Sequence, residues 1–373
     1  MKRREGLMKK IFVISNMYPS SKHLSFGIFV KNQVEALRNE DLDVIVAVNQ
    51  DPETGRKKTI VKYCKWGVNI IKKAIKYRKQ ISLTHAHYVF PSGMFSLLLK
   101  KIFHIPYIVT AHGGDIERMA KKNAKIRQWT ESILKESSAI IAVGPVLAKQ
   151  IEEEYKIPRD KITVCSMGVD REVFQPGNLS LVRGQLGLDQ HDFIYLFVGN
   201  VIKQKGIEEL LQAFQQVKKR TGKSVKLVLI GSRRDGNFIH QIQPYIDDTV
   251  VLVDPLEQKE LVKWFQASNV FVLPSHIEGF GLVALEAIAS GTPVIASSVG
   301  GLVSLLENGT GHLVEAKNPG ALTDEMIRAL HTPKEQYYNE EAAKEILHLH
   351  DVKEITKTVI NLYESTVKGG SNS

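Results

Sequence analysis

Two glutamates stand eight residues apart in an otherwise apolar stretch, PSHIEGFGLVALEAIASGTPVIAS, at residues 274–297. The run NVFVLPS predicts a strand that ends before Glu278, and LVALEAIASG predicts a helix that carries Glu286 on its first turns. In open parallel sheets, ligands bind at the loops that follow the strands. The spacing therefore directs attention to the loop HIEGFG between the two elements.

This loop and the start of the helix offer two kinds of contact to one ligand. Glycines let a ligand approach the backbone closely. The first free N–H groups of the helix, at Gly281, Leu282 and Val283, form an anion site that the helix dipole strengthens. Ionised carboxylates only accept hydrogen bonds, so Glu278 and Glu286 suit hydroxyl groups. A ligand with phosphates and hydroxyls, such as a nucleotide sugar, fits this pattern. The alternative is that Glu278 caps the helix electrostatically and Glu286 is solvated surface.

A second candidate follows the predicted strand FIYLFVGN, which ends with Gly199 and Asn200. Lys205 stands at the opening of the predicted helix GIEELLQAF. A lysine at a helix N-terminus after a strand is well placed for the charge of a diphosphate. The alternative is an ordinary surface lysine.

Two loops in the first half of the chain also carry candidates. The predicted strand PYIVTAH delivers His112 and Asp115 into a loop, where the histidine could hydrogen-bond a substrate or shuttle a proton. The alternative is that His112 caps the strand and Asp115 caps the next helix. Gly27 opens a helix after the first strand and could let a phosphate approach, although the segment is not G-x-G-x-x-G.

The pair His85 and His87 in THAHYVFPSG could in principle bind a metal. No carboxylate or cysteine nearby supplies a third ligand. We therefore predict no metal site and expect these histidines to line the cleft or to pack at a strand end.

Composition indicates a two-domain globular protein. The chain has 373 residues, of which 43% are hydrophobic and 24% charged. Cys64 and Cys165 cannot form a disulfide framework and fit a reducing cytosol. The start MKRREGLMKK resembles a basic signal-peptide region, but the apolar run at residues 11–15 is too short for one and predicts the first strand instead. No run is long enough for a transmembrane helix.

Short apolar runs alternate with amphipathic segments, which predicts parallel sheets buried on both faces. A break rich in Gly, Pro and Asn at residues 167–192 divides the chain into domains of about 1–170 and 171–351, followed by a helical tail. The runs that predict strands include KIFVIS, LDVIVAV, PYIVTAH, SAIIAVG, KITVCS, FIYLFVGN, VKLVLIGS, TVVLVDP, NVFVLPS and TPVIAS.

The net charge of +10 is unevenly distributed, because residues 54–114 contain no Asp or Glu. Such a region suggests an anionic partner, and no nucleic-acid-binding module accompanies it. Segment 56–79 places Trp66, Ile70, Ile71 and Ile75 among lysines, which suits a helix at an anionic membrane surface. The alternative is a solvated helix packed on the sheet. The basic residues are Arg56, Lys57, Lys58, Lys62, Lys65, Lys72, Lys73, Lys76, Arg78, Lys79, Lys100 and Lys101.

Five segments, which follow one another along the chain, resemble the retaining glycosyltransferases of family 4 (group 1 glycosyltransferases), of the bacterial polysaccharide-biosynthesis type. GIFVKNQVEAL resembles the family's first helix, IPYIVTAHGGDI its loop in domain one, and MGVDREVFQP its interdomain segment. VGNVIKQKG resembles the diphosphate loop, and the stretch at 274–297 resembles the E-x7-E signature, which is the most specific of these matches.

The resemblance implies the GT-B fold, with two Rossmann-like domains whose parallel sheets face across a cleft. Domain 1–170 would bind the acceptor, and domain 171–351 the nucleotide sugar. A C-terminal helix at about 352–368 would cross back to the first domain.

The resemblance also implies roles for individual residues. Glu278, His112 and Lys205 would act in catalysis: Glu278 and His112 contact the donor sugar, and Lys205 neutralises the leaving diphosphate. Glu286 would bind the ribose. The implied donor-binding residues are Gly27, Gly199, Asn200, Lys205, Glu278, Gly279, Phe280, Gly281, Leu282, Val283 and Glu286.

Two positions depart from the family pattern. Asn200 stands where the family commonly has an arginine, so Lys205 must carry more of the diphosphate charge. Gly300 and Gly301 match a later loop, but Val303 and Ser304 replace its Pro and Glu.

The implied activity is retaining transfer of a sugar from a nucleotide-diphosphate sugar to a hydroxyl acceptor, without metal or other cofactor. The acceptor would be a saccharide, or a polyprenyl-diphosphate-linked saccharide of capsule, exopolysaccharide or cell-wall synthesis. We expect a cytoplasmic protein, with the inner face of the plasma membrane as an alternative location, and no nucleic-acid partner.

Three rival classes share the architecture or the ligand. The E-x7-E signature argues against a nucleotide-sugar epimerase, and a phosphorylase would need a lysine bound to pyridoxal phosphate. A non-catalytic sugar-nucleotide-binding scaffold stays open because of Asn200.

Overall fold

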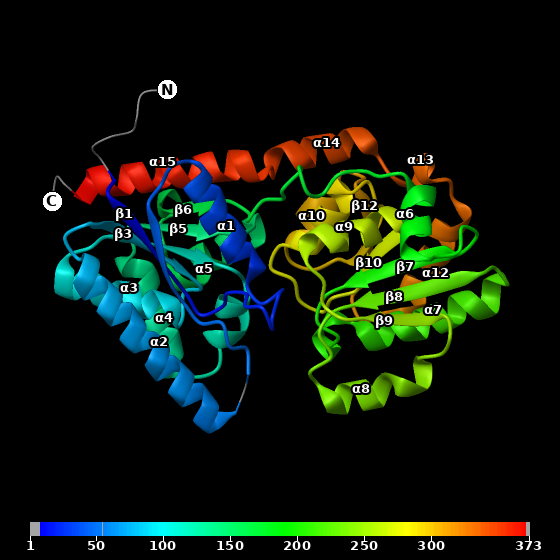
Figure 1. Ribbon diagram of the computed structural model, residues 1–373, viewed down its shortest axis with the longest axis horizontal. Coiled ribbons are helices and arrows are strands. Elements are labelled where there is room, and N and C mark those ends of the chain that lie inside the picture. Colours follow the sequence, from blue (N-terminus) through cyan, green and yellow to red (C-terminus); the bar gives the residue numbers. More distant parts are fainter. Residues whose placement is uncertain (1–7, 54, 371–373) are drawn as a thin grey trace. The chain divides into compact units, whose positions relative to one another are not determined.

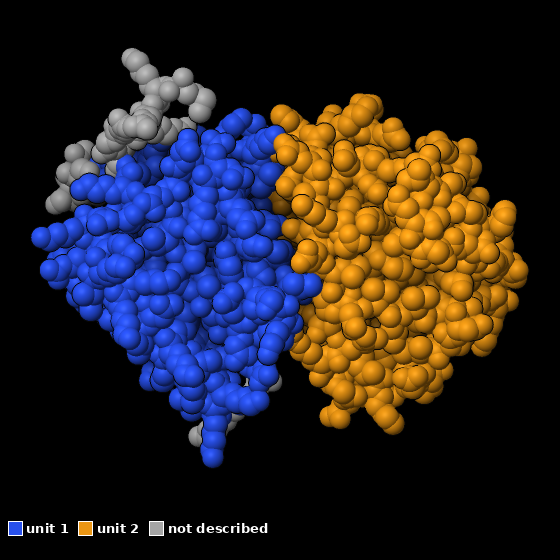
Figure 2. Space-filling view, viewed as in Figure 1, with its two compact units in different colours: residues 1–167, 352–373 blue, residues 168–351 orange. Residues whose placement is uncertain are grey.

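The computed structural model describes residues 8–53 and 55–370, without the side chain of Arg56. The basic residues at positions 2–4 lie outside this part. Contacts divide the chain into two compact units, unit 1 (residues 1–167 and 352–373) and unit 2 (residues 168–351), coloured separately in Figure 2. The last helix thus belongs to unit 1 although it follows unit 2 in sequence.

Unit 1 contains a parallel sheet in the order β2-β1-β3-β4-β5-β6 (Figure 1). A π-helical turn (Asp115–Met119) and a 3-10 turn (Arg159–Lys161) complete its described elements. The strands are β1 (Lys10–Ser15), β2 (Val44–Val48), β3 (Ile81–His87), β4 (Tyr107–Ala111), β5 (Ala139–Ala142) and β6 (Ile162–Val164). The helices are α1 (Ile28–Asn39), α2 (Arg56–Tyr77), α3 (Ser92–Phe103), α4 (Ala124–Glu136), α5 (Pro145–Tyr155) and α15 (Val352–Gly370).

Unit 2 contains a second parallel sheet in the order β12-β11-β10-β7-β8-β9. Its 3-10 turns are Lys203–Lys205 and Gln243–Tyr245. The strands are β7 (Phe193–Val198), β8 (Val225–Ile230), β9 (Val250–Val253), β10 (Val270–Leu273), β11 (Val294–Ser297) and β12 (Gly311–Val314). The helices are α6 (Leu179–Leu186), α7 (Ile207–Thr221), α8 (Gly236–Ile242), α9 (Gln258–Ala267), α10 (Leu282–Ala289), α11 (Gly301–Leu306), α12 (Pro319–His331), α13 (Lys334–Tyr337) and α14 (Glu340–Leu349).

The hydrophobic pattern explains both sheets. All four residues of β10 are buried, as are the last five of β7, because helices cover both faces of a parallel sheet. Helix α7 buries Ile207, Leu210, Leu211 and Phe214, whose spacing of three and four residues lines one helical face. The predicted fold class is confirmed: there are two α/β units, each with a parallel sheet, and a C-terminal helix returns to the first unit.

Each sheet reverses its winding direction once. In unit 2 the chain runs outward from β7 to β9 and then returns to the other side of β7 with β10. In unit 1 the same reversal falls between β1 and β3. At such a switch point, the loops that follow two neighbouring strands diverge and leave a crevice at the carboxyl ends of these strands. Ligands bind in this crevice in this class of sheet.

The returning helix α15 is part of the core of unit 1, where it lies beside α1 in Figure 1. Ile355, Val359 and Tyr363 are buried in the same hydrophobic cluster as residues of β1 and β3. The Tyr363 hydroxyl lies 2.6 Å from Nδ1 of His85 on β3. The C-terminal segment therefore stabilises unit 1 through both apolar packing and a buried polar contact.

Helix α2 packs on the sheet by one face only. Trp66, Ile70 and Ala74 are buried, and the Trp66 indole donates a hydrogen bond to the Ala47 carbonyl at 3.0 Å. Ile71 and Ile75 are exposed, so the apolar residues of the basic segment belong to two different faces. None of the described helices is both long and apolar enough to cross a membrane.

Candidate functional site

Most of the predicted ligand-binding residues of unit 2 lie at its switch point. Gly199, Asn200 and Lys205 follow β7, and the loop from Glu278 to Gly281 follows β10, its neighbour in the sheet. The two loops are far apart in sequence but adjacent in space. Topology thus brings together the two motifs that the sequence singled out separately.

A glycine allows the two loops to touch. Gly206 has φ +69°, and a Cβ there would lie 1.9 Å from the carbonyl oxygen of Pro274, at the end of β10. A second link is the hydrogen bond from the His276 amide to the Gln204 carbonyl, at 2.9 Å. Lys205 is the last residue of a 3-10 turn before α7, rather than the first residue of the helix as the sequence suggested.

Lys205 and Glu278 form an ion pair across these loops. Lys205 Nζ lies 2.6 Å from Oε2 of Glu278, and the Ser275 hydroxyl lies 3.4 Å from the same oxygen. The two charged side chains are 26% and 18% exposed, respectively. Sequence reasoning assigned the lysine and the glutamate to different parts of a ligand and did not foresee that they pair with each other. Opposite charges at this distance largely cancel each other.

The helix N-terminus beside Glu278 has the predicted form. Gly281 is the N-cap of α10 with φ +96°, and the amides of Ala284 and Leu285 are the first to bond its carbonyl, at 2.9 and 3.1 Å. The earlier amides, at Leu282 and Val283, therefore have no partner within the helix. Free N–H groups at the positive end of the helix dipole attract an anion.

Two further glycines, Gly300 and Gly301, pack closely against this loop. A Cβ on Gly300 would lie 1.7 Å from the Glu278 carbonyl oxygen, and one on Gly301 would lie 2.6 Å from the Phe280 Cα. The loop that precedes α11 is therefore packed directly against the loop that carries Glu278. Gly300 and Gly301 are thus needed for this close packing. Val303 and Ser304, the two departures noted in the sequence, lie further along, within α11.

Glu286 lies half-buried on α10 and accepts a hydrogen bond from the Gln258 side chain at 3.1 Å. Burial raises the pKa of Glu286 to about 7, although the hydrogen bond from Gln258 opposes the shift. This carboxyl group is not solvated surface, which was the alternative expected from sequence. It can change its charge near neutral pH, and sequence reasoning missed its amide partner.

Asn200 is exposed at the end of β7. The next residue, Val201, donates its amide hydrogen to the Ser232 carbonyl at 3.0 Å, which joins the loop after β7 to the loop after β8. The latter loop carries Arg233, which pairs with Asp254. Sequence analysis did not single out this arginine, because only the strand order shows that its loop runs beside Asn200.

The two remaining predicted site residues, His112 and Gly27, belong to unit 1. Gly27 is the N-cap of α1, and Phe29 of that helix packs against the His112 ring with 4.9 Å between centroids. Burial lowers the pKa of His112 to about 3. The ring is therefore neutral at physiological pH and suited to hydrogen bonding.

Asp115 fixes the position of His112. Its carboxylate accepts the His112 amide hydrogen at 3.0 Å and the Val89 amide hydrogen at 2.8 Å, so it joins the loops after β4 and β3. Burial raises the pKa of Asp115 to about 6, against the lowering effect of its backbone hydrogen bonds. The sequence suggested only a helix cap at this position.

Metal ligands are not assembled in the part of the chain that the structure describes. There, no group of three His, Cys, Asp or Glu side chains is arranged to hold an ion. The one D-x-D sequence, Asp41-Leu42-Asp43, precedes the amino end of β2, and Asp43 pairs with Lys10. It lies at the opposite end of the strand from the switch point.

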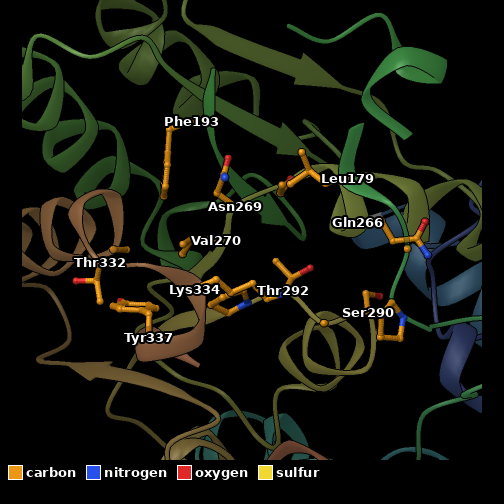
Figure 3. A pocket seen from close by; sticks show the side chains of 16 residues that line it. Leu179, Phe193, Gln266, Asn269, Val270, Ser290, Thr292, Thr332, Lys334 and Tyr337 are labelled. Carbon is orange, nitrogen blue, oxygen red and sulfur yellow. The ribbon is translucent and has the colours of Figure 1, made fainter. Parts of the chain in front are cut away.

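Unit 2 also has a cavity of about 260 Å³ at the amino ends of its strands (Figure 3). Phe193 and Val270, the first residues of β7 and β10, line it. The hydroxyls of Ser290 and Thr292 are already bonded to the carbonyls of Glu286 and Phe265. None of the predicted site residues lines this cavity.

Two family sequence models match the chain, one in each unit. The model of Glycosyltransferase Family 4 matches residues 26–173, and the model of Glycosyl transferases group 1 matches residues 181–346. The first range includes Gly27 and His112, and the second includes Lys205, Glu278 and Glu286.

Curated relatives point the same way. A D-inositol 3-phosphate glycosyltransferase of Frankia alni is 28% identical over 353 residues, which cover 88% of this chain and 82% of that protein. Another, of Corynebacterium diphtheriae, is 31% identical over 274 residues, or 68% of this chain and 64% of that protein. The chain thus matches slightly less than two thirds of the second relative.

Solved structures share the fold. A sucrose-phosphate synthase from Thermosynechococcus elongatus superposes with a TM-score of 0.80 at 24% identity, covering 96% of this chain and 98% of that one. The Anabaena protein HepE, solved in complex with UDP-glucose, has a TM-score of 0.77 at 18% identity, covering 95% and 99%.

The contact at Gly206 gives a stability prediction with a matched control. Gly206 and Gly222 have similar φ values, +69° and +61°, but a Cβ at Gly222 would meet no atom within 4 Å. Left-handed strain alone should make Gly222→Ala cost about 1 kcal/mol of unfolding free energy. Gly206→Ala adds a clash with the backbone and should cost about 3 kcal/mol or more. Urea denaturation of both variants tests this, and equal losses would contradict the contact.

The raised pKa of Glu286 predicts how stability depends on pH. An unfolded glutamate has a pKa of about 4.3, whereas the folded value is about 7. The folded chain therefore binds the proton more tightly, and this residue's contribution to stability falls as pH rises from about 4 to about 7. Glu286→Gln cannot ionise. The unfolding free energy of wild type minus that of the variant should decline over this range and level off above it; a constant difference would refute the shift.

Proposed function

Because the chain belongs to the group 1 and family 4 glycosyltransferases, we propose that it transfers a sugar from a nucleotide-diphosphate sugar to a hydroxyl acceptor with retention of anomeric configuration. The observation that carries this proposal is the Lys205–Glu278 ion pair beside the free N–H groups of α10. A cation, a carboxylate and a helix N-terminus together match a ligand that has both a diphosphate and sugar hydroxyls.

In this proposal the diphosphate of the donor competes with Glu278 for Lys205. The ammonium group then faces the phosphate, and the Glu278 carboxylate becomes free to accept hydrogen bonds from hydroxyls of the donor sugar. Lys205 and the α10 N-terminus stabilise the negative charge that develops on the leaving diphosphate, which lowers the barrier without a metal ion.

The bond changes are those of a retaining displacement. The bond between the anomeric carbon and the diphosphate oxygen breaks, and its electron pair leaves with the phosphate. The acceptor oxygen attacks from the same face of the sugar and passes its proton to the leaving phosphate. No protein nucleophile takes part in this scheme.

Glu286 and Gln258 would bind the ribose. The ionised carboxylate accepts hydrogen bonds from two hydroxyls, and the Gln258 amide holds it in place at 3.1 Å. In unit 1, we assign His112 to a hydrogen bond with the donor sugar and Gly27 to close approach of a phosphate. The neutral state and fixed ring of His112 support a hydrogen-bonding role.

For the acceptor we propose a saccharide, free or linked to a polyprenyl diphosphate. The names of the curated relatives indicate a phosphorylated acceptor for those proteins. In unit 1, the groove at the carboxyl end of β2 is lined by Lys57, Lys58, Lys62 and Lys65 of α2. Asp51 and Glu53 also line this groove, and Glu53 pairs with Lys58, so the lysines outnumber the carboxylates there. This excess of positive charge within the proposed acceptor-binding unit favours an acceptor that carries phosphate.

The exposed face of α2 supports contact with an anionic membrane. Ile60, Val68, Ile71 and Ile75 are exposed, and their spacing of eight, three and four residues puts them on one stripe of the helix. Exposed lysines flank this stripe, and the described residues between 55 and 114 include no carboxylate. An apolar stripe with flanking lysines is the pattern of a helix that lies at a lipid surface.

The donor class is tested by thermal denaturation with UDP-, GDP-, ADP- and dTDP-sugars in the absence of added metal. A ligand that binds only the folded chain raises the midpoint by mass action. We expect one class to raise it, and the rise to shrink in Lys205→Ala. No shift with any of the four at millimolar concentration would contradict a donor site.

The exchange of partners by Lys205 gives a kinetic prediction. Glu278→Ala removes a sugar contact but frees the lysine, so turnover should fall about 100-fold while the Kd for donor changes less than about tenfold. Lys205→Ala should weaken donor binding more when it is made in the wild type than when it is made in the Glu278→Ala variant. In the wild type it leaves the Glu278 carboxylate unpaired, and this carboxylate repels the diphosphate. Near-normal turnover of Glu278→Ala, or additive effects on Kd, would overturn this assignment.

Membrane contact is tested by sedimentation with vesicles of phosphatidylcholine, with and without phosphatidylserine. We expect binding only to the anionic vesicles, weakened by salt and by the double variant Ile71→Ser/Ile75→Ser. The control is Leu181→Ser, which removes an equally exposed side chain from unit 2. No binding to anionic vesicles would exclude this membrane contact, and binding that neither salt nor the double variant weakens would contradict an electrostatic contact through α2.

A further inference from the structure

Three imidazoles lie in a row in unit 1, and those of His85 and His87 are buried whereas that of His112 is half-buried. The rings of His85 and His87, both on β3, are 4.4 Å apart, and the His87 ring lies 5.4 Å from that of His112. Both nitrogens of His85 contact hydroxyls, of Tyr363 at 2.6 Å and of Thr110 at 2.7 Å. His87 Nδ1 lies 3.2 Å from Nε2 of His112. Of these contacts, only the one between His87 and His112 involves a residue with a role in the proposed function.

His87 has one nitrogen with a partner and one without. Its Nε2 is buried and has no hydrogen-bond partner among the described residues. Burial lowers the pKa of His87 well below its usual value and that of His112 to about 3, so both rings are neutral. Two neutral imidazoles share one proton in the bond between them, so one ring donates and the other accepts.

The buried Nε2 of His87 indicates which ring is the donor. If His112 donated, His87 would carry its own proton on Nε2 and bury an N–H group without an acceptor. If His87 donates from Nδ1, its Nε2 keeps only an unpaired lone pair. Buried N–H groups without a partner are rare in folded proteins, and acceptors with an unused lone pair are less so. The second arrangement is therefore favoured.

We propose that His87 is a positioning residue that fixes the tautomer of His112. By donating to Nε2, it holds the His112 proton on Nδ1, for which the described residues provide no hydrogen-bond partner. His112 then presents an N–H donor to an oxygen of the substrate, such as a sugar hydroxyl or a phosphate oxygen. The last step rests on the proposed function, whereas the tautomer does not.

The surroundings of His112 keep its ring in place. Phe29 and Tyr88 contact the ring with centroid distances of 4.9 and 4.5 Å, and Asp115 holds the backbone amide. A ring packed in this way cannot readily turn over to exchange Nδ1 and Nε2. The position of the proton then decides whether the open side of His112 donates or accepts a hydrogen bond.

The tautomer is measured on the ligand-free protein by NMR of histidine labelled with 15N, at pH 7.5. A protonated ring nitrogen and an unprotonated one have well separated 15N shifts, so each proton is located directly. We expect the proton of His112 on Nδ1 in wild type. The His112 signals are assigned by their loss in His112→Gln.

Three variants separate positioning from packing. In His87→Asn the side-chain amide can still donate from near the position of Nδ1, so the His112 tautomer should be kept. In His87→Leu the donor is gone, and the fixed preference for Nδ1 should be lost. Tyr363→Phe removes a contact of His85, one ring further away, and should leave the tautomer of His112 unchanged.

Transferase kinetics provide the second readout. His87→Leu should lower kcat about tenfold, the effect of one lost hydrogen bond, with little change in donor KM. His87→Asn should restore most of the loss, which a purely structural role would not predict.

The NMR result decides the proposal even if the chain transfers no sugar. A wild-type His112 protonated on Nε2 overturns it, as does a His112 whose proton stays on Nδ1 in His87→Leu. If His87→Leu does not fold, wild type and His87→Asn decide. Protonation on Nδ1 in both supports the proposal, and any other result overturns it. A missing transferase activity alongside the expected tautomers would instead count against the proposed function.

Discussion

The approach of Gly206 to the carbonyl of Pro274 is the constraint on which the site in unit 2 depends. A single methyl group at position 206 would lie 1.9 Å from that oxygen, so the loops after β7 and β10 can meet only if this residue is glycine. The meeting puts Lys205 within 2.6 Å of Glu278, which lies 73 residues further along the chain. Strand order makes the two loops neighbours, and the missing side chain lets them come into contact.

Burial then decides the charge of the titratable groups near both switch points. Loss of water raises the pKa of Glu286 to about 7 and that of Asp115 to about 6, and it lowers the pKa of His112 to about 3. The same physical effect has different consequences for each group. The carboxyl groups can change charge near neutral pH, whereas the histidine stays neutral and its chemistry depends on which nitrogen holds the proton.

The sequence predicted the fold class because alternating strand and helix patterns are local and repeated. It also located the loop of Glu278, because the end of a strand, two glycines and the start of a helix stand next to each other there. Strand β3 was not among the predicted runs, since Thr84, His85 and His87 interrupt its apolar pattern, although all three are buried. The ion pair of Lys205 with Glu278 and the hydrogen bond from the Val89 amide to Asp115 could not be predicted, because these partners come from loops that follow other strands of the sheet.

The proposed ligand-binding groups of the two units differ in how their charge is balanced. In unit 2 the groups that would meet a ligand are charged, and a half-buried lysine or glutamate alone would be costly to leave without a partner. Their mutual ion pair offsets that cost. In the proposed function a diphosphate replaces the glutamate at the lysine, because both groups are negatively charged. In unit 1 the imidazoles are neutral, so they need no counter-ion. In the proposed function, recognition by unit 1 therefore rests on the direction of hydrogen bonds, and the partner of each histidine nitrogen matters more than the charge of the ring.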